Sequence, residues 1–133
     1  MTTIEPFDLG LPEAARRLGF SKIRLEDGGV SLSGALDAAC DADPSTIHAL
    51  SAALLDSVCD GAFRSLLVDG DRPSIIELTL RFARPFTSEN GVLTCRAHVV
   101  DLGEHVGTAR AEIADAAGCV FVEADATCVI RRP

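Results

Sequence analysis

The sequence predicts an α+β fold in which one antiparallel sheet of five to six strands wraps around one long central helix. The first observation is the stretch 43–67, DPSTIHALSAALLDSVCDGAFRSLL, which is apolar on nearly every face and contains a single glycine, Gly61. The second is a change of period, because apolar and polar residues alternate through most of residues 74–130. A helix that is apolar all round needs a cover, and one apolar sheet face supplies it.

The central helix is expected over residues 44–67. Asp43 suits the N-cap, and Pro44 suits the first helical position, where a missing N–H costs nothing. At 1.5 Å per residue the helix would be roughly 36 Å long, enough to cross a small domain. Charged residues interrupt the stretch, so it does not have the pattern of a membrane span.

The remaining elements follow from turn signals and periodicity. A short helix is expected over residues 11–18, closed by Gly19, and the Asp27-Gly28-Gly29 turn separates strands at 21–26 and 30–37. After the central helix, strands are expected at 74–83, 92–100, 106–114 and 120–130. Because short turns join these four, they are expected to form an antiparallel meander. The sheet face away from the helix would carry charges of both signs, at Glu77, Arg81, Arg96, Arg110, Glu112, Glu123 and Asp125.

Length and composition restrict the class of protein. A chain of 133 residues is expected to form a single domain, 1–133. Its net charge of −8 argues against nucleic acid as a partner, and any anion contact would come from arginine because Lys22 is the only lysine. The five cysteines form no C-x-x-C pair, and the N-terminus lacks the pattern of a secretory signal. We therefore expect a reduced, cytoplasmic protein with no metal site and no membrane partner.

Two segments carry a family resemblance. Residues 74–85, SIIELTLRFARP, look like the strand that follows the central helix of a known family, and residues 91–130 look like that family's closing strands, including Gly103 and the turn 115–118. From about Arg24 to Ile130 the chain resembles the hotdog-fold acyl-CoA thioesterases of the phenylacetate-pathway (PaaI) type. The resemblance implies a hotdog fold and hydrolysis of a small or medium acyl thioester. It also implies a homodimer or dimer of dimers, and no cofactor besides the coenzyme A of the substrate.

The resemblance also assigns site residues. Asp56, in SAALLDSV, stands where the family has a catalytic carboxylate on the central helix. The family commonly has His-Gly-Gly nine residues earlier, and here the motif is degenerate, Ile47-His48-Ala49. The N–H of the oxyanion hole would then belong to His48 or Ala49. Asp41 replaces a common Asn before the helix, and Ile75 replaces a Thr or Ser in the following strand.

The chemistry of thioester hydrolysis fits a long helix. It needs a carboxylate that activates water or attacks the carbonyl, and Asp56 could do either, or could instead be paired with an arginine. It also needs N–H groups aimed at the oxyanion, which a helix N-terminus offers. Asp60, four residues after Asp56, could also contact the substrate, or it could be solvated or salt-bridged. At that spacing the two carboxylates would repel and one pKa would rise. Ser57 could contact water or substrate, or bond back to the carbonyl of residue 53.

Contacts to the anionic coenzyme could come from Arg81 or Arg84, with Arg131 and Arg132 as further candidates. The sequence shows no Gly-rich phosphate loop, no Ser-His-Asp set and no metal-ligand spacing. Two other functions stay open. One is a non-catalytic hotdog protein that binds an acyl thioester or another hydrophobic ligand. The other is a hydratase or dehydratase, which would need a His-Asp pair and has only His48 near the helix.

Overall fold

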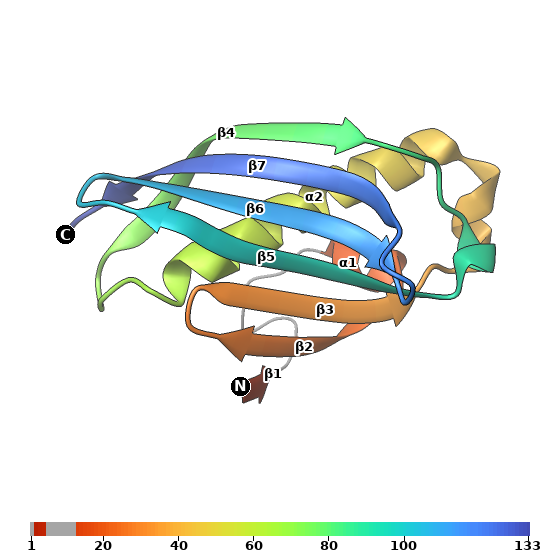
Figure 1. The fold of residues 1–133 in the computed structure, drawn as a ribbon, viewed down its shortest axis with the longest axis horizontal. Helices are drawn as coiled ribbons and strands as arrows, with labels where there is room; N and C mark the ends of the chain where they lie inside the picture. The colour runs from red at the N-terminus through yellow and green to blue at the C-terminus, as the bar shows by residue number, and fades with distance from the viewer. Residues whose placement is uncertain (1, 5–12) are drawn as a thin grey trace.

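The computed structural model describes residues 2–4 and 13–133, and Figure 1 shows one curved antiparallel sheet with the helix α2 lying across its inner face. The strands are β1 (Thr2–Ile4), β2 (Phe20–Glu26), β3 (Gly29–Ala35), β4 (Arg72–Phe82), β5 (Val92–Leu102), β6 (Val106–Asp115) and β7 (Val120–Arg131). The helices are α1 (Glu13–Arg17) and α2 (Pro44–Arg64), with short 3₁₀ turns η2 (Ala38–Ala42) and η3 (Ser88–Asn90). This architecture is a hotdog fold and confirms the predicted fold class.

The sheet differs from the prediction in two respects. It has seven strands, in the order β1-β2-β3-β5-β6-β7-β4, rather than five to six. The additional strand is β1, whose three residues are too few to show an alternation in sequence. The predicted four-stranded meander is wrong, because β4 pairs with β7, and of the four strands in that prediction β5, β6 and β7 alone follow one another in the sheet.

The connection between β4 and β5 explains that error. It spans residues 83–91, too long for a tight hairpin, and contains η3. The Thr87 side chain accepts a hydrogen bond from the Glu89 N–H, and Asn90 closes a capping box with Thr87. The segment therefore crosses the end of the sheet as an ordered unit and delivers β5 beside β3 (Figure 1).

Helix α2 starts as predicted and ends early. Asp43 is the N-cap and accepts a hydrogen bond from the Ser45 N–H, with Pro44 in the first turn. The helix ends at Arg64 rather than at residue 67, because the next residues form tighter turns. The Ser65 hydroxyl there donates to the Ala62 carbonyl and accepts from the Gly28 N–H, which fastens the helix end to the turn between β2 and β3. Of the predicted helix at 11–18, residues 11–12 lie outside the described residues.

One face of α2 forms the core with the inner face of the sheet. Its buried side chains include Ile47, Leu50, Leu54, Leu55, Val58 and Phe63. The middle strands meet them with small residues, since Ala109, Ala111, Ala124 and Ala126 are all buried. These alanines let the helix approach closely. The predicted charged residues occupy the outer face, where Arg81 pairs with Glu123 and Arg110 pairs with Asp125.

The contact between β2 and β3 gives a stability prediction. A Cβ added at Gly34 would lie 1.8 Å from the carbonyl oxygen of Gly19, and backbone cannot move aside. We expect Gly34→Ala to lower the free energy of unfolding by about 3 kcal/mol or more. Urea denaturation measures this loss. The adjacent Ser33→Ala serves as control and should stay within about 0.5 kcal/mol of the parent. Equal midpoints for the parent and Gly34→Ala would contradict the packing described.

Candidate functional site on the open face of helix α2

The side of α2 that faces away from the core is open in the single chain. His48, Ala49 and Asp56 are exposed there, and Ala52 and Ala53 are partly exposed. Spacings of three, four and seven residues place these side chains on one helical face. The all-round apolar pattern of the sequence suggested full burial, but only the opposite face of the helix packs into the core. The predicted site residues therefore share one accessible surface.

Asp56 is the carboxylate on this face with no ion pair or hydrogen bond within the described chain. Partial burial raises its pKa, and the nearby charge of Asp60 raises it further. Asp60 is engaged differently, because its carboxylate accepts a 2.6 Å hydrogen bond from the Arg64 guanidinium. Of the two acids predicted for the site, Asp56 is the one whose oxygens are available to a ligand or a water molecule.

Ser57 takes the alternative named from the sequence. Its hydroxyl donates to the Ala53 carbonyl at 3.0 Å, four residues back along the helix. Such a bond occupies the hydroxyl hydrogen and leaves only the oxygen lone pairs for another partner. Ser57 can therefore accept a hydrogen bond from a water molecule but does not donate one in this conformation.

The amide groups at the start of α2 are already engaged. The Asp43 carboxylate accepts from the Ser45 N–H, and the Asp43 carbonyl accepts from Thr46 and Ile47. The helix begins at Pro44, so the N–H groups of His48 and Ala49 point along the helix to carbonyls four residues back. The imidazole of His48 is exposed near this end, and it stacks on Phe82 with ring centroids 4.2 Å apart.

A small apolar pocket lies beside that stack. Its volume is about 90 Å³, and its walls come from the first turn of α2 and from the segment that follows β4. The residues that line it are Asp41, Pro44, Ile47, His48, Phe82, Arg84, Pro85, Phe86 and Thr87. Sequence reasoning missed Phe82 and Phe86 as site residues, because nothing in the sequence showed that the end of β4 meets the start of the helix.

Hydrogen bonds hold the two walls of this pocket together. The Ser88 N–H and hydroxyl both donate to the Asp41 carboxylate, which joins η2 to η3. The hydrogen bond from the Ser88 hydroxyl lowers the pKa of Asp41 most, and the bond from the Ser88 N–H lowers it further, because both stabilise the charged carboxylate. Asp41 therefore acts as a fixed anion that keeps the segment after β4 against the helix start.

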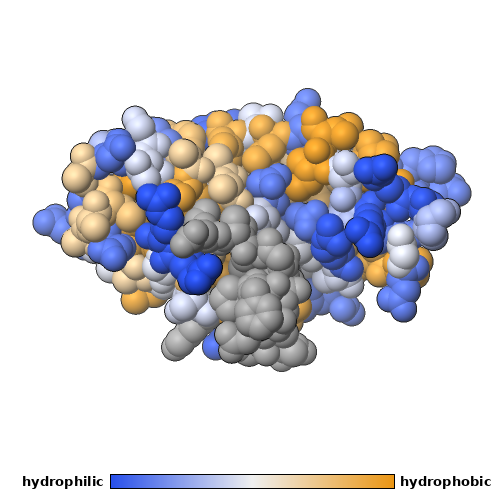
Figure 2. Space-filling view, turned by 180° about the vertical axis from the view of Figure 1, so that it is seen from behind, coloured by the Kyte–Doolittle hydropathy of each residue, from blue (hydrophilic) through white to orange (hydrophobic). Residues whose placement is uncertain are grey.

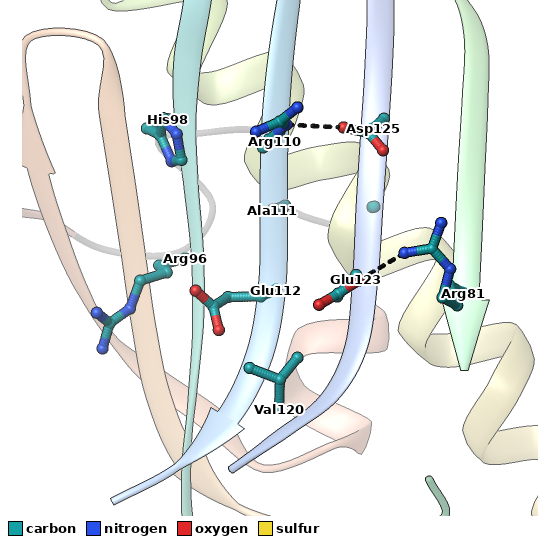
Figure 3. Close-up of a pocket in the computed structure, with 10 residues that line it drawn as sticks. Arg81, Arg96, His98, Arg110, Ala111, Glu112, Val120, Glu123 and Asp125 are labelled. Atoms are coloured by element: carbon teal, nitrogen blue, oxygen red, sulfur yellow. Dashed lines mark hydrogen bonds and ion pairs between the residues drawn. The ribbon is translucent and has the colours of Figure 1, made fainter. Parts of the chain in front are cut away.

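The arginines predicted to contact the coenzyme lie in different parts of the structure. Arg81 lies on the outer sheet face, paired with Glu123 at 2.8 Å, and Figure 3 shows it beside a charged hollow of about 410 Å³. Arg84 lines the small pocket, and its guanidinium donates to the Cys119 sulfur at 3.0 Å. Arg132 bonds Asp71 and the Glu104 carbonyl near the C-terminus. Of these three arginines, only Arg84 lines the pocket beside His48.

The described part of the chain gives little support to a cysteine nucleophile or a metal site. All five cysteines are free. Burial raises the pKa of the Cys59 thiol to about 12 and raises that of Cys95 as well, so neither is a ready nucleophile at neutral pH. Within residues 2–4 and 13–133, no three His, Cys, Asp or Glu side chains cluster as metal ligands would. No helix in those ranges is both long and apolar enough to cross a membrane.

A comparison with known protein families shows the family of this chain. The family model of the thioesterase superfamily matches residues 46–120, which include most of α2 and strands β4 to β6. The chain belongs to the thioesterase superfamily. A comparison with curated proteins finds no match.

Several solved structures have a similar fold. AziG of S. sahachiroi shares 21% identity over 92% of this chain and 99% of its own, with a TM-score of 0.80. A phenylacetic acid degradation-related protein of Ralstonia eutropha shares 26% identity over 92% and 96% of the two chains, with a TM-score of 0.70. A hypothetical thioesterase of Streptococcus pneumoniae, solved with coenzyme A, shares 16% identity over 96% and 99%, with a TM-score of 0.71. This thioesterase-superfamily member thus has the fold of the family along nearly its whole length.

The electrostatics of the helix face give a second prediction. Asp56 should titrate above the ordinary range of an aspartate, and Asp60→Asn should lower its pKa because a neighbouring negative charge is removed. Carbon-13 NMR of the side-chain carboxyls, followed against pH, measures both values. Asp101→Asn, on an exposed part of β5, is the control and should leave the Asp56 titration unchanged. An Asp56 curve that ignores the loss of Asp60 would refute the stated coupling.

Proposed function

We propose that the protein is an acyl-CoA thioesterase in which Asp56 acts as general base or as nucleophile. The observation that carries this proposal is the Asp56 carboxylate, which is unpaired within the described chain, has a raised pKa and lies on the open helix face of a thioesterase-superfamily member. A carboxylate with a raised pKa accepts a proton from water more readily than an ordinary aspartate.

The site requires a second copy of the chain. His48 and Asp56 are eight residues apart on one helix, which separates them by roughly 12 Å along its axis. A thioester carbonyl must lie within about 3 Å of both the attacking group and the polarising group. Two helices that run antiparallel across a two-fold seam would bring Asp56 of one protomer to the helix start of the other. The alanines at 49, 52 and 53 leave room for that approach.

Strand β4 supports the same assembly. It is eleven residues long, lies at the edge of the sheet, and within the described chain pairs on one side only, with β7. Ile76 is 64% exposed and Phe82 is 38% exposed, while Leu78 and Leu80 are partly exposed. Figure 2 shows hydrophobic residues gathered along the upper edge of the molecule, where β4 lies in Figure 1. A long apolar edge pairs readily with another strand, so we infer a homodimer, or a dimer of dimers, built through β4.

The reaction follows from these positions. As base, Asp56 takes a proton from water while the water oxygen adds to the thioester carbonyl, and collapse of the intermediate breaks the C–S bond. The coenzyme thiolate leaves and recovers the proton, which gives a carboxylic acid and free coenzyme A. The positive end of the partner's helix dipole and the His48 imidazole would polarise the carbonyl. Of the arginines proposed to contact the coenzyme, Arg84 is one that lines the pocket at the helix start, and the reaction needs no cofactor besides the coenzyme A of the substrate.

Direct replacement of the acid tests the proposal. We expect Asp56→Asn to lower kcat by about 10²- to 10⁴-fold, the usual contribution of a positioned base. Thiol release from a panel of acyl-CoA substrates is the measurement. Asp101→Asn removes an exposed carboxylate on β5 that is not a candidate site residue, and it should retain the parent rate. If the parent and Asp56→Asn release thiol equally slowly from every substrate, the enzyme assignment is lost.

Mixing two inactive variants tests the shared site. We expect His48→Ala and Asp56→Asn each to be weakly active alone. Mixed dimers should regain about one quarter of the parent activity, because half of random dimers are mixed and each of those has one intact site. Refolding the variants together, followed by the thiol assay, measures the gain. Activity that stays at the mean of the two variants would show that both groups act within one chain.

A second function remains favoured by one specific observation. The amide groups at the helix start are bonded to Asp43, and the residues at 47–49 lack the paired glycines of the family. A protein with this feature could bind an acyl thioester without cleaving it. Saturable binding of acyl-CoA with no thiol release would establish that function. We further propose that the protein works in a reducing, cytoplasmic environment, which the free cysteines support.

A further inference from the structure

The apolar pocket beside His48 has the position of an acyl-chain pocket. It adjoins the imidazole at the start of α2, where the proposed function places the thioester carbonyl. Ile47 and Phe86, both buried, line it, and the stacked rings of His48 and Phe82 form a wall. The charged groups at its edge are already engaged, since Asp41 accepts from Ser88 and Arg84 donates to Cys119. An apolar chain could enter the pocket without breaking any of these hydrogen bonds.

The walls of the pocket are rigid. Pro44 and Pro85 fix the backbone on two sides. The Asp41–Ser88 bonds hold the segment after β4 in place, and Phe86 packs on Phe121 with ring centroids 5.6 Å apart. Widening the pocket on the side of this segment would therefore break packing and hydrogen bonds together.

Resting on the proposed thioesterase function, we propose that this pocket receives the acyl group and restricts it to a short aliphatic chain. The pocket volume of about 90 Å³ is well below the roughly 150 Å³ of an apolar cavity that admits benzene. The part of the pocket that lies within one chain therefore holds a short alkyl chain of about two to four carbons more readily than a phenyl ring. Ile47 and Phe82 set the limit, and the substrate class is a short-chain acyl-CoA rather than an aryl-acetyl or long-chain one.

The charged hollow on the outer sheet face does not compete for this role. It is larger, about 410 Å³, but arginine and carboxylate side chains surround it (Figure 3). An alkyl chain placed there would strip water from those charges, which is costly. The small pocket is thus the better acyl site despite its size.

The experiment is a chain-length series from acetyl- to decanoyl-CoA, with phenylacetyl-CoA included. We expect kcat/KM to rise to butyryl-CoA and to fall by about tenfold or more at octanoyl-CoA, because a chain that cannot enter loses its contacts. Phenylacetyl-CoA should be as poor as octanoyl-CoA. Equal or better turnover of octanoyl- or phenylacetyl-CoA would overturn the proposal.

Two variants enlarge the pocket, and one serves as control. Phe82→Ala and Ile47→Ala should each move the optimum toward longer chains, by about tenfold in the ratio of octanoyl to butyryl turnover. Because Ile47 is buried, Phe82→Ala is the safer variant, and circular dichroism checks that both fold. Val100→Ala removes an exposed apolar group on β5 and should leave the ratio unchanged. A folded Phe82→Ala protein with the parent ratio would refute the role of this wall.

The outcomes separate this inference from the function on which it rests. If no acyl-CoA is cleaved, the thioesterase proposal fails, and calorimetric titration with butyryl- and octanoyl-CoA then tests the pocket alone. Tighter binding of butyryl-CoA, by about tenfold, would still support a short-chain pocket. Equal or tighter binding of octanoyl-CoA would refute it.

Discussion

Packing of one face of α2 against the inner face of the sheet is the contact on which the rest of the molecule depends. The middle strands contribute buried alanines to this layer, and the helix contributes its large side chains. This division of sizes lets a single layer of sheet curve around the helix. Both helix ends are fastened as well, at Asp43 by its cap and at Ser65 by its bond to Gly28. A helix held at both ends in this way keeps Asp56 in a fixed position.

Much of the fold was predictable because its signals are local. The Asp43-Pro44 pair marked the start of α2, and the alternation of apolar residues marked strands β4 to β7. What the sequence did not show was the neighbour of each strand. That choice depends on the path of residues 83–91, whose 3₁₀ turn and capping box are properties of folded backbone. A three-residue strand such as β1 carries no periodic signal at all.

The candidate site was likewise predictable only in part. Asp56 stood out in the sequence because a carboxylate on an apolar helix needs a purpose or a partner. The engagement of Ser57 with the Ala53 carbonyl was one of two outcomes that the sequence left open. The pocket beside His48 was not visible, because Phe82 and Phe86 lie far along the chain from the helix start. Sequence reasoning finds reactive groups more easily than the apolar walls that shape their substrates.

The small residues on the open face of α2 have a consequence for any paired assembly. Ala52 lies midway between His48 and Asp56, so in an antiparallel pair of helices it would sit nearest the symmetry axis and meet its own copy. Every atom added at such a position is added twice to one gap, and any charge there faces an identical charge. A position that faces its own copy in this way permits only small, uncharged side chains, whatever substrate the neighbouring residues bind.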